Sequence, residues 1–514
     1  MRKPVYVNID INTHVTPFLT KVSEQKNICR EMLYPFVDIY RNTSVTDVLF
    51  DVFCQYSAVD TKFWDTYADR YLCESEKGQT VNYKDRYRGI YVLNEQYQLD
   101  PYRVWFERCH EVGLRPWLSV RMNDAHGFTS RNHHLRSGFY DIAMQNGWIL
   151  GEDYGWFGGC YNYKVPQVRE RMLGYIREQL LRYDIYGLEL DFLRENQCFA
   201  YLTDDMEACT QIMNQFIREV KKAVTEAEEK WGHKIRIAAR LMRDLKHNTY
   251  YGFDPEVWAA EKLVDLVIPA PRFTGSDSGI PVAAWKELLP EVEIVPGMET
   301  GIIYHKEVGL GIGTAAVARG LAASFLAQGA DGIYFYNCFV NPDTVYCTEL
   351  ENVDHPYVRS MEAFRSCGSL EEISGYPIRF AVLPQPDERY AAAPPFWSPL
   401  PAALCGRTHT FEIITGAVTA DKEGSLIIGL ENCQNPAEVK VLCNGSLCGS
   451  FKEVDLAYIP GIGAQVANYV TQETVCYRCV LPKEALTDSK QRIEVTSDQE
   501  ESQAVLNWLE LVLI

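Results

Sequence analysis

An alternation of short apolar runs with helical segments, found eight times within residues 1–375, constrains the fold of this chain more than any other feature. The runs are rich in β-branched and aromatic residues, which favour strands, and the segments between them place apolar residues at helical spacing. Eight strands that alternate with helices are typical of a (β/α)₈ barrel. The predicted strands are residues 5–10, 48–54, 114–122, 186–193, 234–242, 264–270, 292–298 and 330–336.

One predicted helix follows each of the eight strands, and two long excursions lie at residues 55–99 and 123–164. A doubly wound open sheet would give a similar alternation. That topology is disfavoured because no Gly-rich turn joins the first strand to the first helix, as a dinucleotide site requires. The predicted helices are residues 24–40, 101–111, 166–183, 204–231, 255–262, 282–289, 314–328 and 355–364.

The pattern changes after Gly375. Residues 376–408 are rich in proline and are predicted to form a linker or a strap on the barrel, because proline disrupts regular helices. Residues 409–514 contain short β-like runs separated by turn residues, which is typical of a small β-sandwich. The predicted architecture is therefore an α/β chain with a (β/α)₈ TIM barrel at 1–375, a strap, and a C-terminal β-sandwich that braces the barrel.

The charge and the apolar runs narrow the choice of partners. The formal net charge is −19, which argues against nucleic acid and anionic membranes as partners, because both require a basic surface. No run of apolar residues is long enough to span a membrane, and the N-terminus lacks the apolar core of a signal peptide. We therefore expect a cytoplasmic protein that acts on a small or neutral ligand; the sequence does not indicate an oligomeric state.

The sixteen cysteines are scattered and are expected to be reduced thiols. Two close pairs stand out, Cys443/Cys448 and Cys476/Cys479. A zinc site is disfavoured because the second pair lies in a β-like run with no other tight pair beside it. No P-loop and no HExxH motif is present, so we expect neither a cofactor nor a metal.

Acidic residues stand at the ends of two predicted strands. In a barrel the active site lies at the C-terminal ends of the strands, and the fourth run ends with Glu189, Asp191 and Glu195. Because side chains alternate along a strand, Glu189 and Asp191 share one face, which we expect to be the barrel interior. Glu299 follows the apolar seventh run across the barrel. Two opposed carboxylates are what glycoside hydrolysis requires.

The candidate catalytic residues are Asp191 and Glu299, with Glu195 as the substitute. Two acids of the fourth run have structural alternatives. Glu195 can be a solvated loop residue, and Glu189 can be a buried acid paired with an arginine. Arginines also gather at the predicted strand ends, where they can tune the acids or bind an anionic sugar such as a uronate. The candidate substrate-binding residues are Arg121, Asn123, His126, Trp156, Glu189, Arg194, Arg240, Arg243, Arg272 and Asn337.

Two further groups of residues border the predicted cavity. Asn8, Asp10, Asn12 and His14 alternate along and beyond the first strand and can reach its floor. A Gly-rich loop with Gly309, Gly311 and Gly313 precedes the helix after the seventh strand. Barrel phosphate sites use this region, although a tight turn or a lid is the simpler interpretation.

At YGLELDFLRE, LRPWLSVRMND and KIRIAARLMRD, the chain resembles glycoside-hydrolase-like (β/α)₈ barrel proteins of gut and soil bacteria. The resemblance covers roughly residues 1–375. It implies a retaining or inverting glycosidase with acids at the fourth and seventh strands. Many barrel glycosidases end the fourth strand with Asn-Glu, whereas here the order is Glu195-Asn196, so Asp191 fits a nucleophile at this strand end better.

The sequence thus favours a glycoside hydrolase acting on carbohydrate. Two alternatives stay open. The chain can be a non-catalytic carbohydrate-binding or scaffold barrel, or a lyase or isomerase that holds a phosphorylated or uronic sugar with its arginines.

Overall fold

A computed structural model of the 514-residue chain describes most of the sequence. The described residues are 2–11, 15–72, 83–126, 135–271, 278–299, 303–305, 309–311, 315–338, 356–382, 399–419, 421–433, 435–454, 458–460, 473–487, 489–497, 499 and 502–514.

Nine parallel strands form one curled sheet, in the order β8-β7-β6-β5-β4-β2-β1-β12-β9, and the short β3 (Tyr56–Ser57) pairs antiparallel with β2. Each of the eight predicted strand runs overlaps at least one of these strands. Their bounds are β1 (Val5–Ile9), β2 (Val45–Cys54), β4 (Arg115–Arg121), β5 (Gly187–Asp191), β6 (Arg236–Met242), β7 (Leu266–Ala270), β8 (Glu293–Ile294), β9 (Gly297–Glu299) and β12 (Ile333–Cys338).

The predicted seventh strand is divided into β8 and β9, which pair with different neighbours. β8 pairs with β7, and β9 pairs with β12. Between them, the N–H of Val295 donates to Val267 O (3.0 Å), and the N–H of Tyr334 donates to Pro296 O (3.1 Å). Pro296 has no N–H to give to β7, which accounts for the break.

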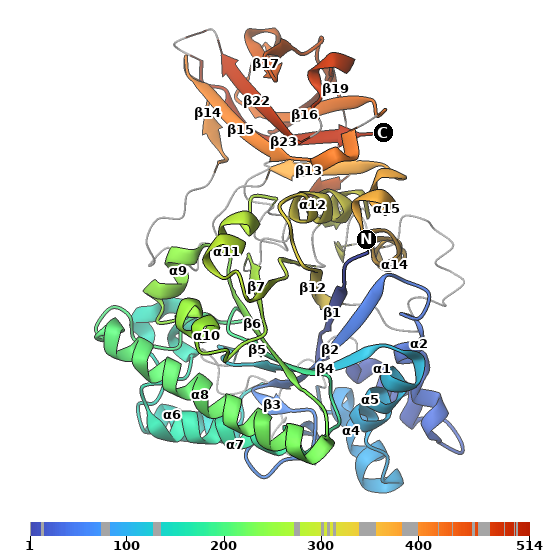
Figure 1. The fold of residues 1–514 in the computed structure, drawn as a ribbon, viewed down its shortest axis with the longest axis vertical. Coiled ribbons are helices and arrows are strands. Elements are labelled where there is room, and N and C mark those ends of the chain that lie inside the picture. Colours follow the sequence, from blue (N-terminus) through green and yellow to red (C-terminus); the bar gives the residue numbers. More distant parts are fainter. Residues whose placement is uncertain are drawn as a thin grey trace.

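Helices flank the sheet (Figure 1). α8 begins after Asp205, whose carboxylate accepts from the N–H groups of Glu207 and Ala208, and it ends at Gly232 in the left-handed conformation (φ 76°). The helices are α1 (Thr16–Ser23), α2 (Pro35–Asp38), α3 (Tyr67–Leu72), α4 (Tyr83–Tyr91), α5 (Pro101–Val112), α6 (Gly138–Gln145), α7 (Pro166–Arg182), α8 (Met206–Trp231), α9 (Leu245–Tyr250), α10 (Pro255–Ala260), α11 (Val282–Leu288), α12 (Ala315–Ala327), α14 (Pro356–Ser366) and α15 (Leu370–Ser374).

The prediction of one helix over residues 24–40 is wrong. The first helix, α1, lies earlier, and the predicted range contains only the 3₁₀ turn η2 (Arg30–Leu33) and the four-residue α2. Asn27 adopts a left-handed backbone (φ 54°), and Pro35 cannot donate a helical hydrogen bond. Both features prevent a continuous helix.

The concave face of the sheet has its own core, separate from the core between the sheet and the helices. Aromatic residues dominate it at the N-terminal ends of the strands. The rings of Tyr6 and Trp117 pack edge to face there, with centroids 5.9 Å apart. This inner cluster consists of Tyr6, Leu49, Trp117, Ala238, Leu266, Ile268, Val295, Tyr334 and Tyr336.

Two antiparallel sheets make up the C-terminal part. One has the order β13-β23-β16-β21-β19, with β14 also on β23, and the other has the order β15-β22-β17-β18. β13 and β14 come from the range predicted as a strap, so that range contributes two strands to the larger sheet. The bounds are β13 (Ile378–Val382), β14 (Ala402–Ala403), β15 (Thr408–Ile414), β16 (Gly424–Glu431), β17 (Val439–Cys443), β18 (Ser446–Leu447), β19 (Lys452–Glu453), β21 (Val475–Val480), β22 (Lys490–Ser497) and β23 (Val505–Leu513).

α12 lies between the parallel sheet and β13 (Figure 1). Residues 315–325 of this helix are all buried, as expected for a helix that is apolar on every side. The side chain of Arg319 donates to Pro377 O (3.0 Å). A Cβ atom on Gly320 would lie 2.0 Å from the carbonyl oxygen of Arg379, so glycine permits the helix to approach the backbone of β13.

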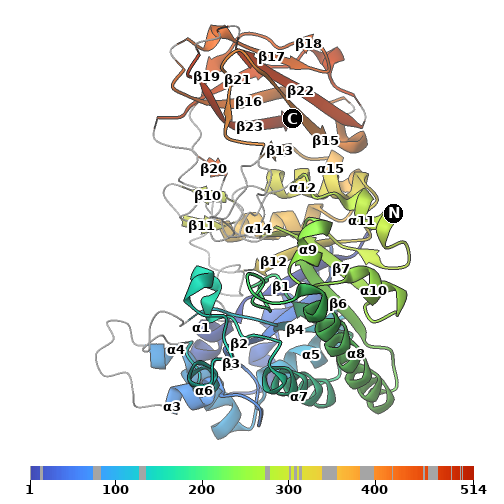
Figure 2. The same cartoon turned by 90° about the vertical axis from the view of Figure 1, so that its left-hand side faces the viewer.

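A second link between the two parts is a small sheet of three antiparallel strands, in the order β11-β10-β20. β10 (Ile303–His305) and β11 (Gly309–Gly311) follow β9, whereas β20 (Tyr458–Pro460) comes from the C-terminal part. Figure 2 shows these strands between the parallel sheet and the two C-terminal sheets. Within the described residues, we find no helix with the length and apolar character needed to cross a membrane.

Candidate active site

Charged side chains replace the aromatic ones at the C-terminal ends of the central strands. Arg121 of β4, Asp191 of β5 and Arg240 of β6 are neighbours in the strand register. Parallel strands in register present the same face at paired positions, so all three side chains project into the interior of the curled sheet. All three are almost fully buried, and a buried charge requires a partner.

Asp191 is held by four donors. The backbone N–H groups of Leu193 (3.0 Å) and Arg194 (2.9 Å) donate to Oδ1, and so does the Nη1 group of Arg240 (2.8 Å). The hydroxyl of Tyr336 donates to Oδ2 (3.0 Å). The Arg240 guanidinium also lies over the Tyr336 ring, with 3.4 Å between Cζ and the ring centroid. Since Tyr336 belongs to β12 and Asp191 to β5, this contact spans the interior of the sheet.

Glu189 lies one layer deeper on the same face of β5 and has no exposed surface. Tyr334 donates its hydroxyl to Glu189 Oε1, and Asn8 donates its Nδ2 group to Oε2 (3.1 Å). Both of these donors are neutral side chains. Burial, and then repulsion from the charge of Asp191, raise the pKa of Glu189 to about 7.

This raised pKa predicts a pH-dependent cost to stability. An acid whose pKa is higher in the folded protein binds more protons there, so the free energy of unfolding falls as pH rises from about 4.5 through 7. Glu189→Gln removes this effect. We expect the variant to gain stability relative to wild type across that window, by on the order of 3 kcal/mol. Urea denaturation at pH 4.5 and 8 measures the change.

Glu229→Gln, at an exposed position of α8, is the control for this experiment. Its stability relative to wild type should be the same at both pH values. A Glu189→Gln variant that behaves like this control would contradict the assignment of a raised pKa to Glu189.

A second ionic network surrounds Arg121. Its guanidinium contacts Asp10 Oδ2 through Nη2 (2.9 Å) and Asp51 Oδ2 through Nε (3.0 Å). Its Nη1 group donates to the sulfur of Cys54 (3.1 Å) and lies 3.7 Å from Asp124 Oδ2. Burial raises the pKa of Asp51 to about 8, although Arg121 acts in the opposite direction. The network ties β1, β2 and β4 together at their C-terminal ends.

His126 is fixed in one tautomer by its two neighbours. Its Nδ1 atom is hydrogen-bonded to Asp124 Oδ1, and its Nε2 atom lies 3.2 Å from Nη2 of Arg194. An arginine can only donate, so Nε2 accepts and Nδ1 carries the hydrogen. Burial alone would raise the pKa of Asp124, but the contact with His126 and the charges of Arg194 and Arg121 hold it well below its usual value.

Cys54, Asp124 and His126 are the one group of three potential metal ligands within the described residues whose ligand atoms all lie within 4.8 Å of one another. The guanidinium of Arg121 occupies the space beside Cys54 and Asp124, and Arg194 Nε lies 3.8 Å from Asp124 Oδ2. Two adjacent positive charges oppose the binding of a cation. This set therefore does not support a metal site.

Trp156 lies at the rim and is 37% exposed. It belongs to the 3₁₀ segment η4 (Glu152–Gly159), and its indole N–H donates to Glu195 Oε1 (3.0 Å). Its ring meets His126 edge to face, with centroids 5.8 Å apart. Glu195 is fully buried and holds the indole, which is a structural use of the residue named as a substitute catalytic acid.

Three other candidate residues make contacts with the backbone or with side chains other than Asp191. Asn123 is buried and donates to the carbonyl groups of Tyr161 and Gln197, so it anchors two loops. Asn337 has a left-handed backbone (φ 58°), and its N–H donates to Asn8 Oδ1 (3.4 Å). Arg243 donates to Gly279 O (2.6 Å) and lies near Asp244, on the side of α11.

Some candidates lie wholly or partly outside the described residues. Arg272, Asn12, His14 and Gly313 are outside them. Glu299 ends β9, and its backbone is paired in register with Tyr336. Gly309 and Gly311 bound the short strand β11 rather than an open loop.

The sequence did not single out Tyr334, Tyr336, Asp51 or Asp124 as central to the site. The alternation in the eighth run, Ile-Tyr-Phe-Tyr, could have indicated that both tyrosines share the inner face. Asp51 interrupts an apolar strand, and a lone charge in such a run is a signal for a paired, buried group.

No family model matches this sequence, and no curated protein matches it. Three similar solved structures are glycoside hydrolases. The glycoside hydrolase domain of PgaB (BpsB) from Bordetella bronchiseptica has a TM-score of 0.44 and 10% identity, covering 72% of this chain and 99% of that chain. The alpha-L-fucosidase isoenzyme 2 from Paenibacillus thiaminolyticus has a TM-score of 0.42 and 11% identity, covering 74% of this chain and 52% of that one.

The third is an endo-fucoidan hydrolase from glycoside hydrolase family 107, with a TM-score of 0.40 and 11% identity, covering 99% of this chain and 67% of that chain. This chain thus spans about half the length of the fucosidase. At this level of similarity, the comparisons assign neither a family nor an activity to the chain.

Proposed function

We propose that this chain is a glycoside hydrolase in which Asp191 is the reacting carboxylate. One observation carries the proposal: Asp191 stands at the C-terminal end of a central strand, and donors from β6, β12 and its own loop fix both of its oxygens. Such fixed orientation is what a nucleophile or a charge-stabilising carboxylate needs beside an oxocarbenium-like transition state.

The proposal includes a closed barrel. The residues of β8 and β9 would act as the two halves of one strand, since one half pairs with β7 and the other with β12. This gives eight strand positions and puts the Glu299 backbone across the barrel from β5. Glu299 remains the proposed second acid, because its backbone lies beside Tyr336, whose hydroxyl reaches Asp191. The two C-terminal sheets would then form the bracing β-sandwich.

We infer a neutral sugar as the substrate. The three arginines of the site are already engaged: Arg121 with Asp10 and Asp51, Arg240 with Asp191, and Arg194 with His126. Their positive charges are balanced by these partners, so an anionic sugar would find no arginine without a contact of its own. Trp156 would offer an apolar face to a sugar ring. The cytoplasmic location and the lack of nucleic-acid and membrane partners remain predictions from the sequence.

One observation favours the non-catalytic alternative. The side chain of Asp191 has no exposed surface, and Arg240 contacts it directly. A carboxylate used only as a structural ion pair would have the same partners. Hydrolytic activity, rather than sugar binding alone, separates the two possibilities.

A panel of aryl glycosides and neutral oligosaccharides tests the proposal, with Glu299→Gln as the informative variant. If Glu299 protonates the leaving oxygen, the variant should lose about 10²–10⁴-fold in rate on poor leaving groups, and much less on activated ones. Steady-state kinetics with a series of substituted phenyl glycosides measures this dependence.

Glu293→Gln is the matched control, because Glu293 lies in the same run but at the other end of the barrel, where it contacts Arg236 (2.9 Å). It should leave the rates on all substrates unchanged. Binding of oligosaccharide without hydrolysis by wild type would support the scaffold alternative instead.

A further inference from the structure

A row of tyrosine rings connects three loops beside the proposed active site. Tyr250 packs against Tyr201, with ring centroids 5.5 Å apart, and Tyr201 packs against Tyr154 at 5.3 Å. Tyr251 meets both Tyr201 (5.3 Å) and Tyr250 (5.1 Å) edge to face. These spacings are those of directly packed aromatic rings. The proposed hydrolytic chemistry uses none of the four.

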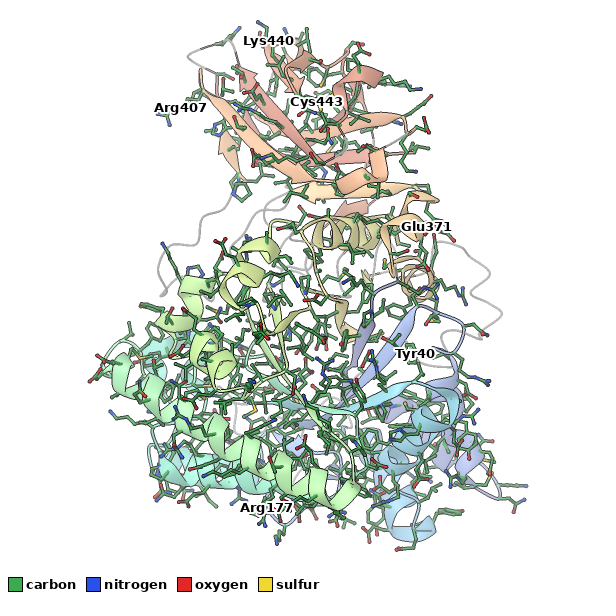
Figure 3. The ribbon with its side chains drawn as sticks, viewed as in Figure 1. Tyr40, Arg177, Glu371, Arg407, Lys440 and Cys443 are labelled. Atoms are coloured by element: carbon green, nitrogen blue, oxygen red, sulfur yellow. The ribbon has the colours of Figure 1, made fainter. Side chains whose placement is uncertain are left out.

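The three loops leave neighbouring strands of the parallel sheet. Tyr154 belongs to η4, in the excursion that follows β4, Tyr201 lies between β5 and α8, and Tyr250 ends α9, which follows β6. The C-terminal ends of these strands carry the charged residues of the proposed site, and ligands of α/β sheets bind at this end of the strands. Figure 3 shows side chains around α9, at the position that Figure 1 labels.

Three apolar side chains along this row are open to solvent. Trp156 and Tyr250 are each 37% exposed, and Leu202 is 52% exposed, whereas Tyr154 and Tyr201 are buried. Trp156 lies two residues from Tyr154 in η4, and Leu202 directly follows Tyr201. The buried rings thus connect three exposed apolar side chains that come from three different loops.

Hydrogen bonds hold these loops in place. The N–H of Leu202 donates to the hydroxyl of Tyr154 (3.3 Å), which joins the loop after β5 to η4. Asn248 ties α9 to the end of β6, since its Oδ1 accepts from the N–H of Met242 (3.1 Å) and its Nδ2 donates to Met242 O (2.9 Å). A surface that is fixed in advance loses little conformational entropy when it binds a ligand.

Contacts also connect the row to the proposed reacting carboxylate. The Trp156 ring meets that of His126, with centroids 5.8 Å apart, and His126 Nε2 lies 3.2 Å from Nη2 of Arg194. The backbone N–H of Arg194 donates to Asp191 Oδ1 (2.9 Å). The exposed apolar side chains therefore begin beside the proposed site and continue to α9.

A carbohydrate fits this surface better than a protein or a nucleic acid does. Sugar rings carry C–H groups on their faces and hydroxyl groups at their edges, which suits partly exposed aromatic rings with polar tips. A standard protein interface takes about 20–30 residues from each partner, far more than three exposed side chains. The net charge of −19 opposes a nucleic acid, although its bases also stack on aromatic rings.

We propose that Trp156, Leu202 and Tyr250 form a distal sugar-binding surface, which binds the further units of a neutral oligosaccharide whose scissile bond lies at Asp191. This surface extends the proposed hydrolase function, on which it rests for the position of the scissile bond. It makes an oligosaccharide, rather than a glycoside of one sugar, the preferred substrate. Affinity should therefore rise with the number of sugar units, and so should kcat/KM.

Titration calorimetry with neutral gluco-, xylo-, galacto- and manno-oligosaccharides of increasing length tests the proposal. The parent protein is full-length Asp191→Asn, so that hydrolysis does not disturb the measurement, or wild type if wild type hydrolyses none of these sugars. We expect the affinity for at least one series to rise with length. Tyr250→Ala in the same parent should bind the longer members about 3- to 10-fold more weakly and lose most of the gain with length.

Three further variants separate the loss of the ring from a loss of folding. Tyr250→Phe keeps the ring and should bind like the parent. Leu202→Ser, at the most exposed of the three positions, should weaken the same longer members. Tyr376→Ala is the matched control, because Tyr376 is also an exposed tyrosine (43%) but precedes β13, and it should change no affinity.

The outcomes distinguish this surface from the hydrolase function. Hydrolysis of aryl glycosides, combined with affinities that do not depend on length or that Tyr250→Ala does not change, overturns the surface and leaves the hydrolase function standing. Length-dependent binding that Tyr250→Ala weakens, without any hydrolysis, supports the surface and overturns the hydrolase function. The surface is also overturned if no oligosaccharide binds, or if Tyr250→Ala instead dissociates a dimer in sedimentation velocity.

Discussion

Asp191→Asn abolishes hydrolysis, with an expected fall in kcat of at least about 10³-fold. The substitution keeps the shape of the side chain and an oxygen that can accept from the N–H groups of Leu193 and Arg194. It removes the negative charge that would stabilise or attack the anomeric carbon. Initial rates on the best substrate of the glycoside panel, measured with an excess of enzyme, give the size of the loss.

The control for this variant is Asp60→Asn, since the Asp60 side chain is 79% exposed and forms a surface ion pair with Arg182. It should retain wild-type rates. Because Asp191→Asn also leaves Arg240 without its charged partner, melting curves and circular dichroism must accompany the kinetics. A folded Asp191→Asn protein with undiminished kcat would place the reacting carboxylate elsewhere.

Tyr336→Phe serves as a milder probe of the same contact. It deletes only the hydroxyl that donates to Asp191 Oδ2, so it should lower kcat while leaving KM close to wild type. A purely structural role for Tyr336 would instead lower thermal stability without this separation between kcat and KM.

Gly320→Ala lowers the stability of the whole chain. The added methyl group would lie 2.0 Å from the carbonyl oxygen of Arg379 and 2.7 Å from its carbonyl carbon. These are backbone atoms, which cannot rotate away. Alanine favours the helix by about 1 kcal/mol relative to glycine, but overpacking of this kind costs about 3 kcal/mol or more. The net effect is a lower melting temperature, which differential scanning calorimetry measures.

Gly174→Ala is the matched control, because Gly174 also lies inside a helix, α7, and has a close neighbour. That neighbour is the ring of Phe63, at 2.3 Å from the added Cβ. Phe63 is a partly buried side chain that can move, so the loss should be smaller. Equal losses at the two positions would show that α12 and β13 can separate without cost.

The sequence predicted the strands well because their signal is local. Each strand is a short apolar run, and burial on both faces of a parallel sheet makes such runs nearly continuous. The helix prediction over residues 24–40 failed because apolar spacing alone does not report a left-handed turn at Asn27. The break at Pro296 also has a local cause. Whether a proline interrupts a strand, however, depends on whether the neighbouring strand requires a hydrogen bond from the missing N–H.

The candidate site was only partly predictable, for a different reason. Asp191 and Arg240 are strand-end residues, and their alternation along the strand gave the face on which they lie. The partner of Asp191 from β12, Tyr336, lies 145 residues away in the chain. Similarly, the sequence indicates Glu195 as a substitute catalytic acid, whereas in the structure its carboxylate accepts a hydrogen bond from the Trp156 indole. Such pairings depend on the curvature of the sheet, which the sequence pattern does not specify.

The position of α12 bears on how the gene for such a protein could be divided. The helix belongs to the N-terminal part of the chain, residues 1–375, yet it packs against β13, which belongs to the C-terminal part. A fragment that stopped at Gly375 would leave an apolar helix in water and invite aggregation. Recombination at that point would combine two surfaces that do not pack in a complementary way. The N-terminal and C-terminal parts are therefore expected to be inherited together.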